Sequence, residues 1–124
     1  MKTEIWALLE QSWFQQGDIG TTRNHTSAMD VEGLPAPLHE SLITMYRECF
    51  GEASQPDWDD LADFVDALAF AEFGLDSAVL GGRDQLAKRH AQIANWLNWP
   101  QGRFDDLTRW WNSSDHRHRF DRAP

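Results

Sequence analysis

The chain of 124 residues contains one cysteine, Cys49, and no long run of apolar residues. A single cysteine excludes an intramolecular disulfide. Cys49 falls in an apolar helical pattern with no histidine or lysine beside it, which predicts a buried structural thiol rather than a nucleophile. No segment approaches the roughly 20 apolar residues of a membrane span, and the first residues lack the apolar stretch of a signal peptide. We therefore expect a cytoplasmic protein without membrane association.

Cations are scarce in the first two thirds of the chain. Residues 1–82 contain three Lys or Arg and fifteen Asp or Glu, a balance of −12, whereas residues 83–124 contain eight and five, a balance of +3. Nucleic-acid affinity comes largely from cations that neutralise phosphates, so the acidic part is not expected to bind nucleic acid. A macromolecular partner of this part is expected to be basic. The alternative is that the negative charge serves solubility alone.

Local catalytic signatures are also missing. The sequence has no Gly-rich phosphate loop, no Ser/His/Asp signature and no paired CxxC, and it suggests no cofactor. The composition, with 41% apolar and 25% charged residues, is that of an ordinary globular domain. A chain of this length buries roughly two thirds of its unfolded surface, so it needs neither a disulfide framework nor a structural metal.

Apolar residues recur at helical spacing, which predicts an all-α fold: a compact single-domain bundle of about five helices. The helical domain is expected over residues 1–112, and residues 113–124 form a polar, basic tail. Thr3 is a candidate cap for the first helix, and Asp57 is well placed to cap the third. The first expected helix follows Thr3 and ends before Gly17, and the second begins near Pro35 or Pro37 and runs to Phe50. The others span about residues 58–73, 86–97 and 104–111, and residues 17–34 are expected to form a long loop.

The apolar stripes of these helices indicate which side chains form the core. Residues expected to be buried include Leu42, Leu61, Leu68, Ile93 and Leu97. The chain also has seven tryptophans, an unusually high number. Trp6, Trp13 and Trp111 fit inward stripes and are expected to fill gaps between helices. The tryptophans at helix ends or off the main stripes are candidates for partial exposure: Trp58, Trp96, Trp99 and Trp110.

The expected third helix carries the sharpest functional pattern. At about 100° per residue, Asp59, Asp63 and Asp66 share one stripe, with Asp60 at its margin. The same direction continues into Phe70 and Phe73. An exposed acidic strip that leads into an aromatic one suits a partner with a basic rim and an apolar pocket. The alternative is a solvated acidic face whose phenylalanines pack under a neighbouring helix.

Glu72 falls within the stripe assigned to the core, where a carboxylate needs a charged or hydrogen-bonding partner. A catalytic acid or metal ligand is one interpretation; contact with solvent or with an arginine is the more common one. All-α nucleotide pyrophosphohydrolases bind magnesium through acidic pairs on neighbouring helices. Here Asp63-x-x-Asp66 stands without the matching glutamate pair of that family on the second helix. No metal site is therefore predicted.

None of the five histidines has an identifiable nucleophile as a partner in the sequence pattern. His90 lies on the inner face of the expected fourth helix and is predicted to be a satisfied core residue. His116 and His118 alternate with arginines, which oppose a bound cation, so a basic tail that contacts the acidic body or a partner is preferred to a metal cluster.

These observations favour a binding protein over an enzyme. The leading hypothesis is an inhibitor, antitoxin or immunity-type protein that uses the acidic and aromatic helix face to block a basic site on a partner protein. One alternative is a small all-α metal-dependent hydrolase that uses Asp63, Asp66, Glu72 and Asp76. The other is a regulatory, nucleic-acid-associated protein that uses the basic C-terminal third.

Overall fold

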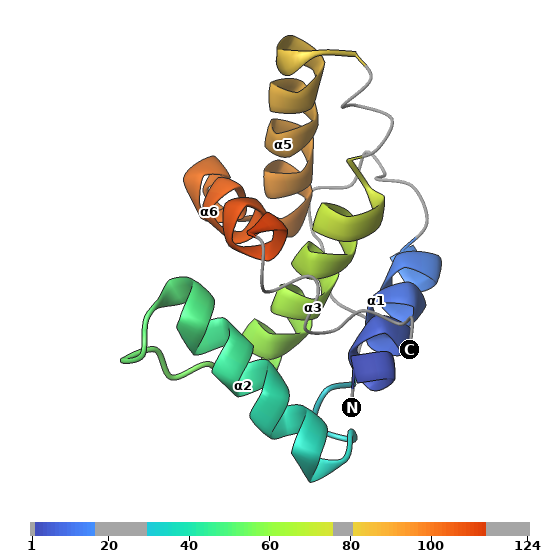
Figure 1. The fold of residues 1–124 in the computed structure, drawn as a ribbon, viewed down its shortest axis with the longest axis vertical. Helices are drawn as coiled ribbons and strands as arrows, with labels where there is room; N and C mark the ends of the chain where they lie inside the picture. The colour runs from blue at the N-terminus through green and yellow to red at the C-terminus, as the bar shows by residue number, and fades with distance from the viewer. Residues whose placement is uncertain (1, 17–29, 76–80, 114–124) are drawn as a thin grey trace.

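The computed structural model describes residues 2–16, 30–75 and 81–113, and within these ranges the chain forms helices and no strand. The helices are α1 (Lys2–Gln16), α2 (Ala36–Phe50), α3 (Trp58–Phe73), α5 (Arg83–Leu97) and α6 (Gln101–Asn112). They pack into a compact bundle (Figure 1). This confirms the all-α prediction, and the predicted third helix matches α3 in both bounds. Most of the 17–34 loop and of the C-terminal tail lies outside the described residues.

Local signals in the sequence set the helix ends. Pro35 precedes α2, and Gly51 ends it with φ at 116°, a backbone conformation that favours glycine. Asn98 ends α5 in the left-handed conformation, and Pro100 is the N-cap residue of α6, which begins at Gln101. The expectation for Thr3 is wrong, because α1 already begins at Lys2 and includes it.

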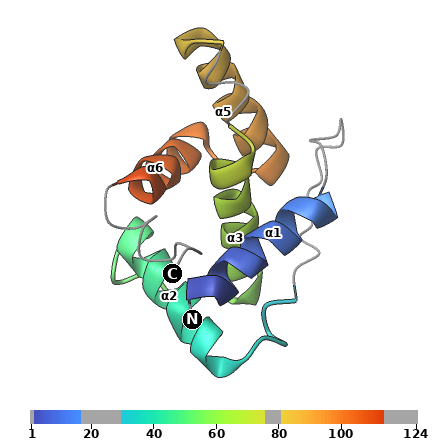
Figure 2. The same ribbon diagram turned by 45° about the vertical axis from the view of Figure 1, so that its right-hand side comes forward.

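The central element is α3, which contacts all four other helices. Its side chains are buried almost without a break from Leu61 to Ala71, with half-buried Asp63 as the exception. Figure 2 shows α1 crossing one side of α3, while α6 lies between α5 and α2. Alanines along α3 permit this close approach on several sides. A helix with apolar residues all round is typical of such a central position.

The predicted core is confirmed. Each of the following is at most 3% exposed: Leu42, Leu61, Leu68, Ile93 and Leu97. Trp6 and Trp111 are also buried, and their rings meet edge to face with centroids 6.0 Å apart. Among the tryptophans expected to be partly exposed, Trp58 is exposed and the other three are half-buried. No helix in the described ranges has both the length and the apolar composition needed to cross a membrane.

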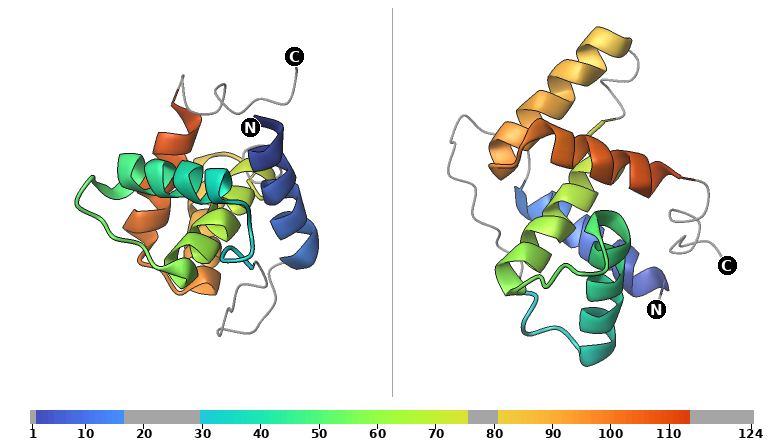
Figure 3. Two further views of the ribbon diagram at one scale, coloured as in Figure 1. Left: turned by 90° about the horizontal axis from the view of Figure 1, so that it is seen from below. Right: turned by 90° about the vertical axis from the view of Figure 1, so that its left-hand side faces the viewer.

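The beginnings of α2 and α3 lie together. The chain leaves α2 at Gly51 and returns through residues 52–57, so that α3 starts beside the first turns of α2 (Figure 3). The ring of His39 near the start of α2 consequently meets that of Trp58 at the start of α3. Farther along both helices, Tyr46 contacts Phe64. The fold thereby gathers two helix N-termini at one end of the molecule.

Candidate functional site

The predicted binding face of α3 lies largely against α1. Asp66 is 1% exposed and Phe70 is fully buried. The Ser12 hydroxyl donates a hydrogen bond to Asp66 Oδ1 at 2.6 Å, and the rings of Trp13 and Phe70 meet edge to face at 5.7 Å. The expectation that Asp66 and Phe70 belong to an exposed stripe is wrong, because α1 covers this side of α3.

The remaining members of that stripe divide into two groups. Phe73 is half-buried and packs against Trp6 and Trp13, so it belongs to the contact with α1. Asp63 is also half-buried, whereas Asp59 and Asp60 are exposed. The acidic strip and the aromatic strip therefore do not form one continuous surface. The exposed part of the predicted acidic strip, Asp59 and Asp60, is confined to the first turn of α3.

Within that turn, Asp60 has a structural role. The Asp57 side chain accepts a hydrogen bond from the Asp60 backbone N–H at 2.8 Å, and the Asp60 side chain accepts one from the Asp57 backbone N–H at 3.1 Å. This reciprocal pair is a capping box, which satisfies backbone donors that would otherwise lack partners. The predicted cap at Asp57 is confirmed. Asp59 takes no part in the box and remains available to a partner.

An exposed tryptophan stands beside these aspartates. Trp58 is 41% exposed, and its ring centroid lies 4.7 Å from that of His39. The His39 ring is also held by a polar contact, because its Nε2 lies 2.8 Å from the carbonyl oxygen of Val31. If Nε2 carries the proton, it donates this hydrogen bond. The contact joins the 30–34 turn, α2 and α3, and it supports Trp58 from one side.

The chain around this contact is acidic. We use the name Trp58 surface for the rings of His39 and Trp58 together with the exposed residues next to Val31, His39 and Trp58 in the sequence. Its carboxylates are Asp30, Glu32, Glu40, Asp57 and Asp59. Arg47 is the only Lys or Arg in residues 30–75, and its Nε donates to the Ser54 carbonyl oxygen near the opposite end of α2. The Trp58 surface therefore combines an exposed aromatic ring with exposed acidic sequence neighbours.

Sequence reasoning did not identify His39 and Trp58 as a pair. The sequence predicts Trp58 as a helix-end tryptophan, and His39 lies in the first turn of α2. Nothing local indicates that the two helix starts meet, because the 52–57 return that brings them together carries no distinctive pattern. The signal available was the position of Trp58 directly after the cap at Asp57, where a side chain projects from the end of a helix.

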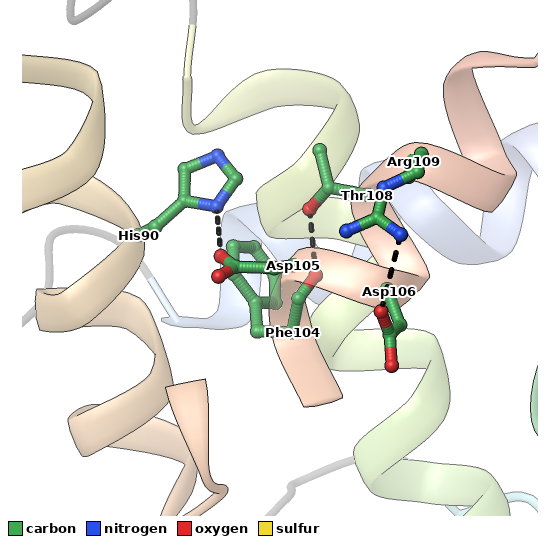
Figure 4. A network of polar contacts seen from close by, with 6 residues as sticks. All are labelled: His90, Phe104, Asp105, Asp106, Thr108 and Arg109. Carbon is green, nitrogen blue, oxygen red and sulfur yellow. Dashed lines mark hydrogen bonds and ion pairs between the residues drawn. The ribbon is translucent and has the colours of Figure 1, made fainter. Parts of the chain in front are cut away.

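A second polar cluster joins α5 to α6. His90 Nδ1 lies 2.6 Å from Asp105 Oδ1, and the His90 ring meets Phe104 edge to face at 5.2 Å (Figure 4). Nearby, the Thr108 hydroxyl donates to the Phe104 carbonyl oxygen, and Arg109 forms an exposed ion pair with Asp106. His90 is thus a partly buried side chain with a partner, as predicted. Its position between two helices indicates a structural contact.

Glu72 also has a partner, the indole of Trp111. Trp111 Nε1 donates a hydrogen bond to Glu72 Oε2 at 2.9 Å, which links α3 to α6. Glu72 is half-buried at the end of α3. The indole N–H is a fixed donor, so this contact orients the Trp111 ring in the core.

The acidic residues considered for a metal site are directed to different neighbours. Asp66 bonds to α1 and Glu72 to α6, while Asp76 lies outside the described residues. Across residues 2–16, 30–75 and 81–113, no three His, Cys, Asp or Glu side chains lie close enough together to hold a metal ion. The described geometry offers no metal-ligand set for the hydrolase alternative.

Cys49 is half-buried beside the contact between α2 and α6. Burial raises the pKa of its thiol from 9.0 to about 12, while the charge of Arg103 lowers this pKa and that of Asp106 raises it. Because the thiolate is the reactive form, the raised pKa favours slow reaction of the Cys49 thiol near neutral pH. This agrees with the structural role predicted for Cys49.

Comparisons with known proteins do not identify a relative. No protein-family model matches the chain, and searches of curated proteins and of solved structures found no significant match. Function is therefore inferred from side-chain geometry and charge.

Proposed function

We propose that the chain binds a basic partner protein through the Trp58 surface and acts as an inhibitor, antitoxin or immunity-type protein that blocks a basic site. The observation that carries the proposal is the exposed Trp58 ring, which packs against His39 and has exposed acidic sequence neighbours. Tryptophan is enriched among the residues that dominate binding energy at protein interfaces. The proposal keeps the expected kind of partner and moves the contact from the middle of α3 to its beginning.

The exposure of Trp58 is unusual within the described structure. Large apolar side chains are otherwise packed into the core, and only Phe14, at 80%, is also exposed. Trp58 differs from Phe14 because it is held by a second ring. A supported ring loses little conformational freedom on binding, which favours its use as an anchor.

The acidic residues of the Trp58 surface supply the electrostatic part of the proposal. Glu32, Glu40 and Asp59 are exposed and lie outside the capping box. Negative charge around an aromatic anchor steers a basic partner during encounter and adds specificity more than affinity. A basic enzyme active site, such as one that binds phosphate groups, is the kind of surface that this arrangement would cover.

The test begins with the tagged protein and a native lysate, followed by purification of the captured partner and kinetic measurement. Trp58→Ala should raise the dissociation rate at least tenfold, because it removes the anchor. The double variant Glu40→Gln/Asp59→Asn should lower the association rate and flatten its dependence on ionic strength, with little effect on dissociation.

Two matched controls locate the effect. Phe14→Ala removes the other exposed ring, and Asp84→Asn removes an exposed carboxylate on α5. Both should bind as the wild type does. If Trp58→Ala binds with unchanged rates, the Trp58 surface is not the interface; if the captured partner is acidic, the charge argument is wrong as well.

A further inference from the structure

A second side-chain arrangement, on the contact between α2 and α6, has no role in the function proposed above. The guanidinium of Arg103 lies over three aromatic rings. Its carbon is 3.9 Å from the ring centroid of Phe50, 4.7 Å from that of Trp99 and 5.7 Å from that of Tyr46. Nη2 also donates a hydrogen bond to Tyr46 Oη at 2.6 Å.

Arg103 is a cation without a matching anion in the described part of the chain. It is half-buried, and no carboxylate among the described residues lies within ion-pair distance of it. Asp106, one turn along α6, instead pairs with Arg109. This is unexpected in a chain of net charge −9. Aromatic faces stabilise a partly desolvated guanidinium, but they do not accept hydrogen bonds in its plane, and the one bond to Tyr46 uses only part of its N–H donors.

The contacts between the guanidinium and the rings bear on which ligand its remaining N–H donors can bind. The guanidinium carbon packs against the Phe50 and Trp99 rings, whose planes are 81° apart, so the two rings together restrict its position. The N–H groups of a guanidinium share one plane, in which two of them match the two oxygens of a carboxylate. The Tyr46 hydroxyl accepts from Nη2 and therefore has its own proton to donate. The two side chains thus present neighbouring donors, and the rings hold the guanidinium in place before a ligand arrives.

We propose that Arg103 and Tyr46 form a binding site for a carboxylate, framed by Phe50 and Trp99. A planar, singly charged carboxylate fits the site better than a phosphate dianion, because the acidic chain repels additional negative charge. The carboxylate can belong to a free acid or to an Asp or Glu side chain of another protein. Both sources present the same two oxygens to the guanidinium.

The experiment follows the Arg103 Nε–H resonance by NMR during titration at constant ionic strength, with acetate and with N-acetylglutamate amide as probes. The Arg103 resonance should shift in a saturable manner with at least one probe, and the probe that saturates at lower concentration identifies the source. Arg103→Lys should weaken the affinity at least tenfold, measured on backbone resonances of α6. Tyr46→Phe, which keeps the ring, should weaken it about threefold.

Arg109→Lys is the matched control, since Arg109 lies on the same helix, is exposed and is not stacked on rings. It should leave the affinity unchanged. Equal, non-saturating shifts at Arg103 and Arg109 would show that the ions act only through general screening and would overturn the site. Phosphate binding more tightly than both carboxylates would overturn the assignment of the ligand. If Arg103→Lys does not fold, the wild-type resonance and Tyr46→Phe still decide between these outcomes.

Discussion

Ser12 on α1 donates a hydrogen bond of 2.6 Å to Asp66 on α3, and both side chains are 1% exposed. The contact places a polar pair inside an otherwise apolar interface between the two helices. Buried polar groups are tolerated when they are hydrogen-bonded and are costly when a partner is removed. The pair therefore fixes how α1 sits on α3, and it explains why an aspartate can occupy the middle of a central helix.

Ser12→Ala should lower the free energy of unfolding by about 1–3 kcal/mol, because Asp66 loses a buried donor. Urea denaturation followed by circular dichroism measures the change. The control is Gln11→Ala, which alters the neighbouring exposed residue of α1 and should change stability by less than about 0.5 kcal/mol. Equal effects of the two substitutions would contradict a specific role for the hydroxyl.

The sequence predicts the elements of this fold well, because their signals are local. Asp57 caps α3 through contacts within four residues, and Gly51 ends α2 through its own backbone conformation. The apolar spacing that predicted burial of Leu42 and Ile93 depends only on helical geometry. Such features do not require knowledge of which helices meet.

The predicted site depended on tertiary contacts, and there the helical pattern was insufficient. The expectation that Asp66 faces solvent depends on its helical spacing from Asp59 and Asp63, which places the three carboxylates on one stripe. Yet Leu61, Phe64 and Phe70 point in different directions around α3, and all are buried. Apolar residues around the whole helix were the signal that α3 is central. The Ser12 partner of Asp66 lies 54 residues away and has no local signature.

The exposed residues of the candidate sites also divide into those that the local sequence predicts and those that depend on tertiary contacts. Asp59 and Asp60 are exposed, as expected for charged residues in a first helical turn. The His39 ring that supports Trp58, and the rings that surround Arg103, come from separate elements. Their proximity follows from how α2 meets α3 and α6. Residue patterns within one helix do not encode it.

Phe70→Ala should destabilise the protein by about 3–5 kcal/mol, because it leaves a cavity between α3 and α1 where the ring meets Trp13. Phe14→Ala removes the same side chain from an exposed position on α1 and should cost less than about 0.5 kcal/mol. Thermal and urea unfolding of the two variants provide the comparison. A small loss for Phe70→Ala would restore the view that this ring faces solvent.

Cys49 provides a prediction in alkaline solution. Burial raises its pKa from 9.0 to about 12, so the folded chain keeps the thiol proton at pH values where the unfolded chain releases it. The unfolded state therefore binds fewer protons between about pH 9 and 12. When the unfolded state binds fewer protons, the free energy of unfolding falls as the pH rises. The contribution of the protonated Cys49 thiol to this free energy is therefore fully present only below pH 9.

The measurement compares the wild type with Cys49→Ala by urea denaturation from pH 7 to 11. Tyrosine and lysine titrate in both proteins, so the difference between the two curves isolates Cys49. That difference should be constant up to about pH 8 and should then shift steadily against the wild type. In the native wild type at pH 8, a disulfide reagent should label Cys49 slower than in the unfolded chain by about three orders of magnitude, because so little thiolate is present. Rapid labelling at pH 8, or parallel stability curves up to pH 11, would show that the thiol ionises as readily in the folded chain as in the unfolded one.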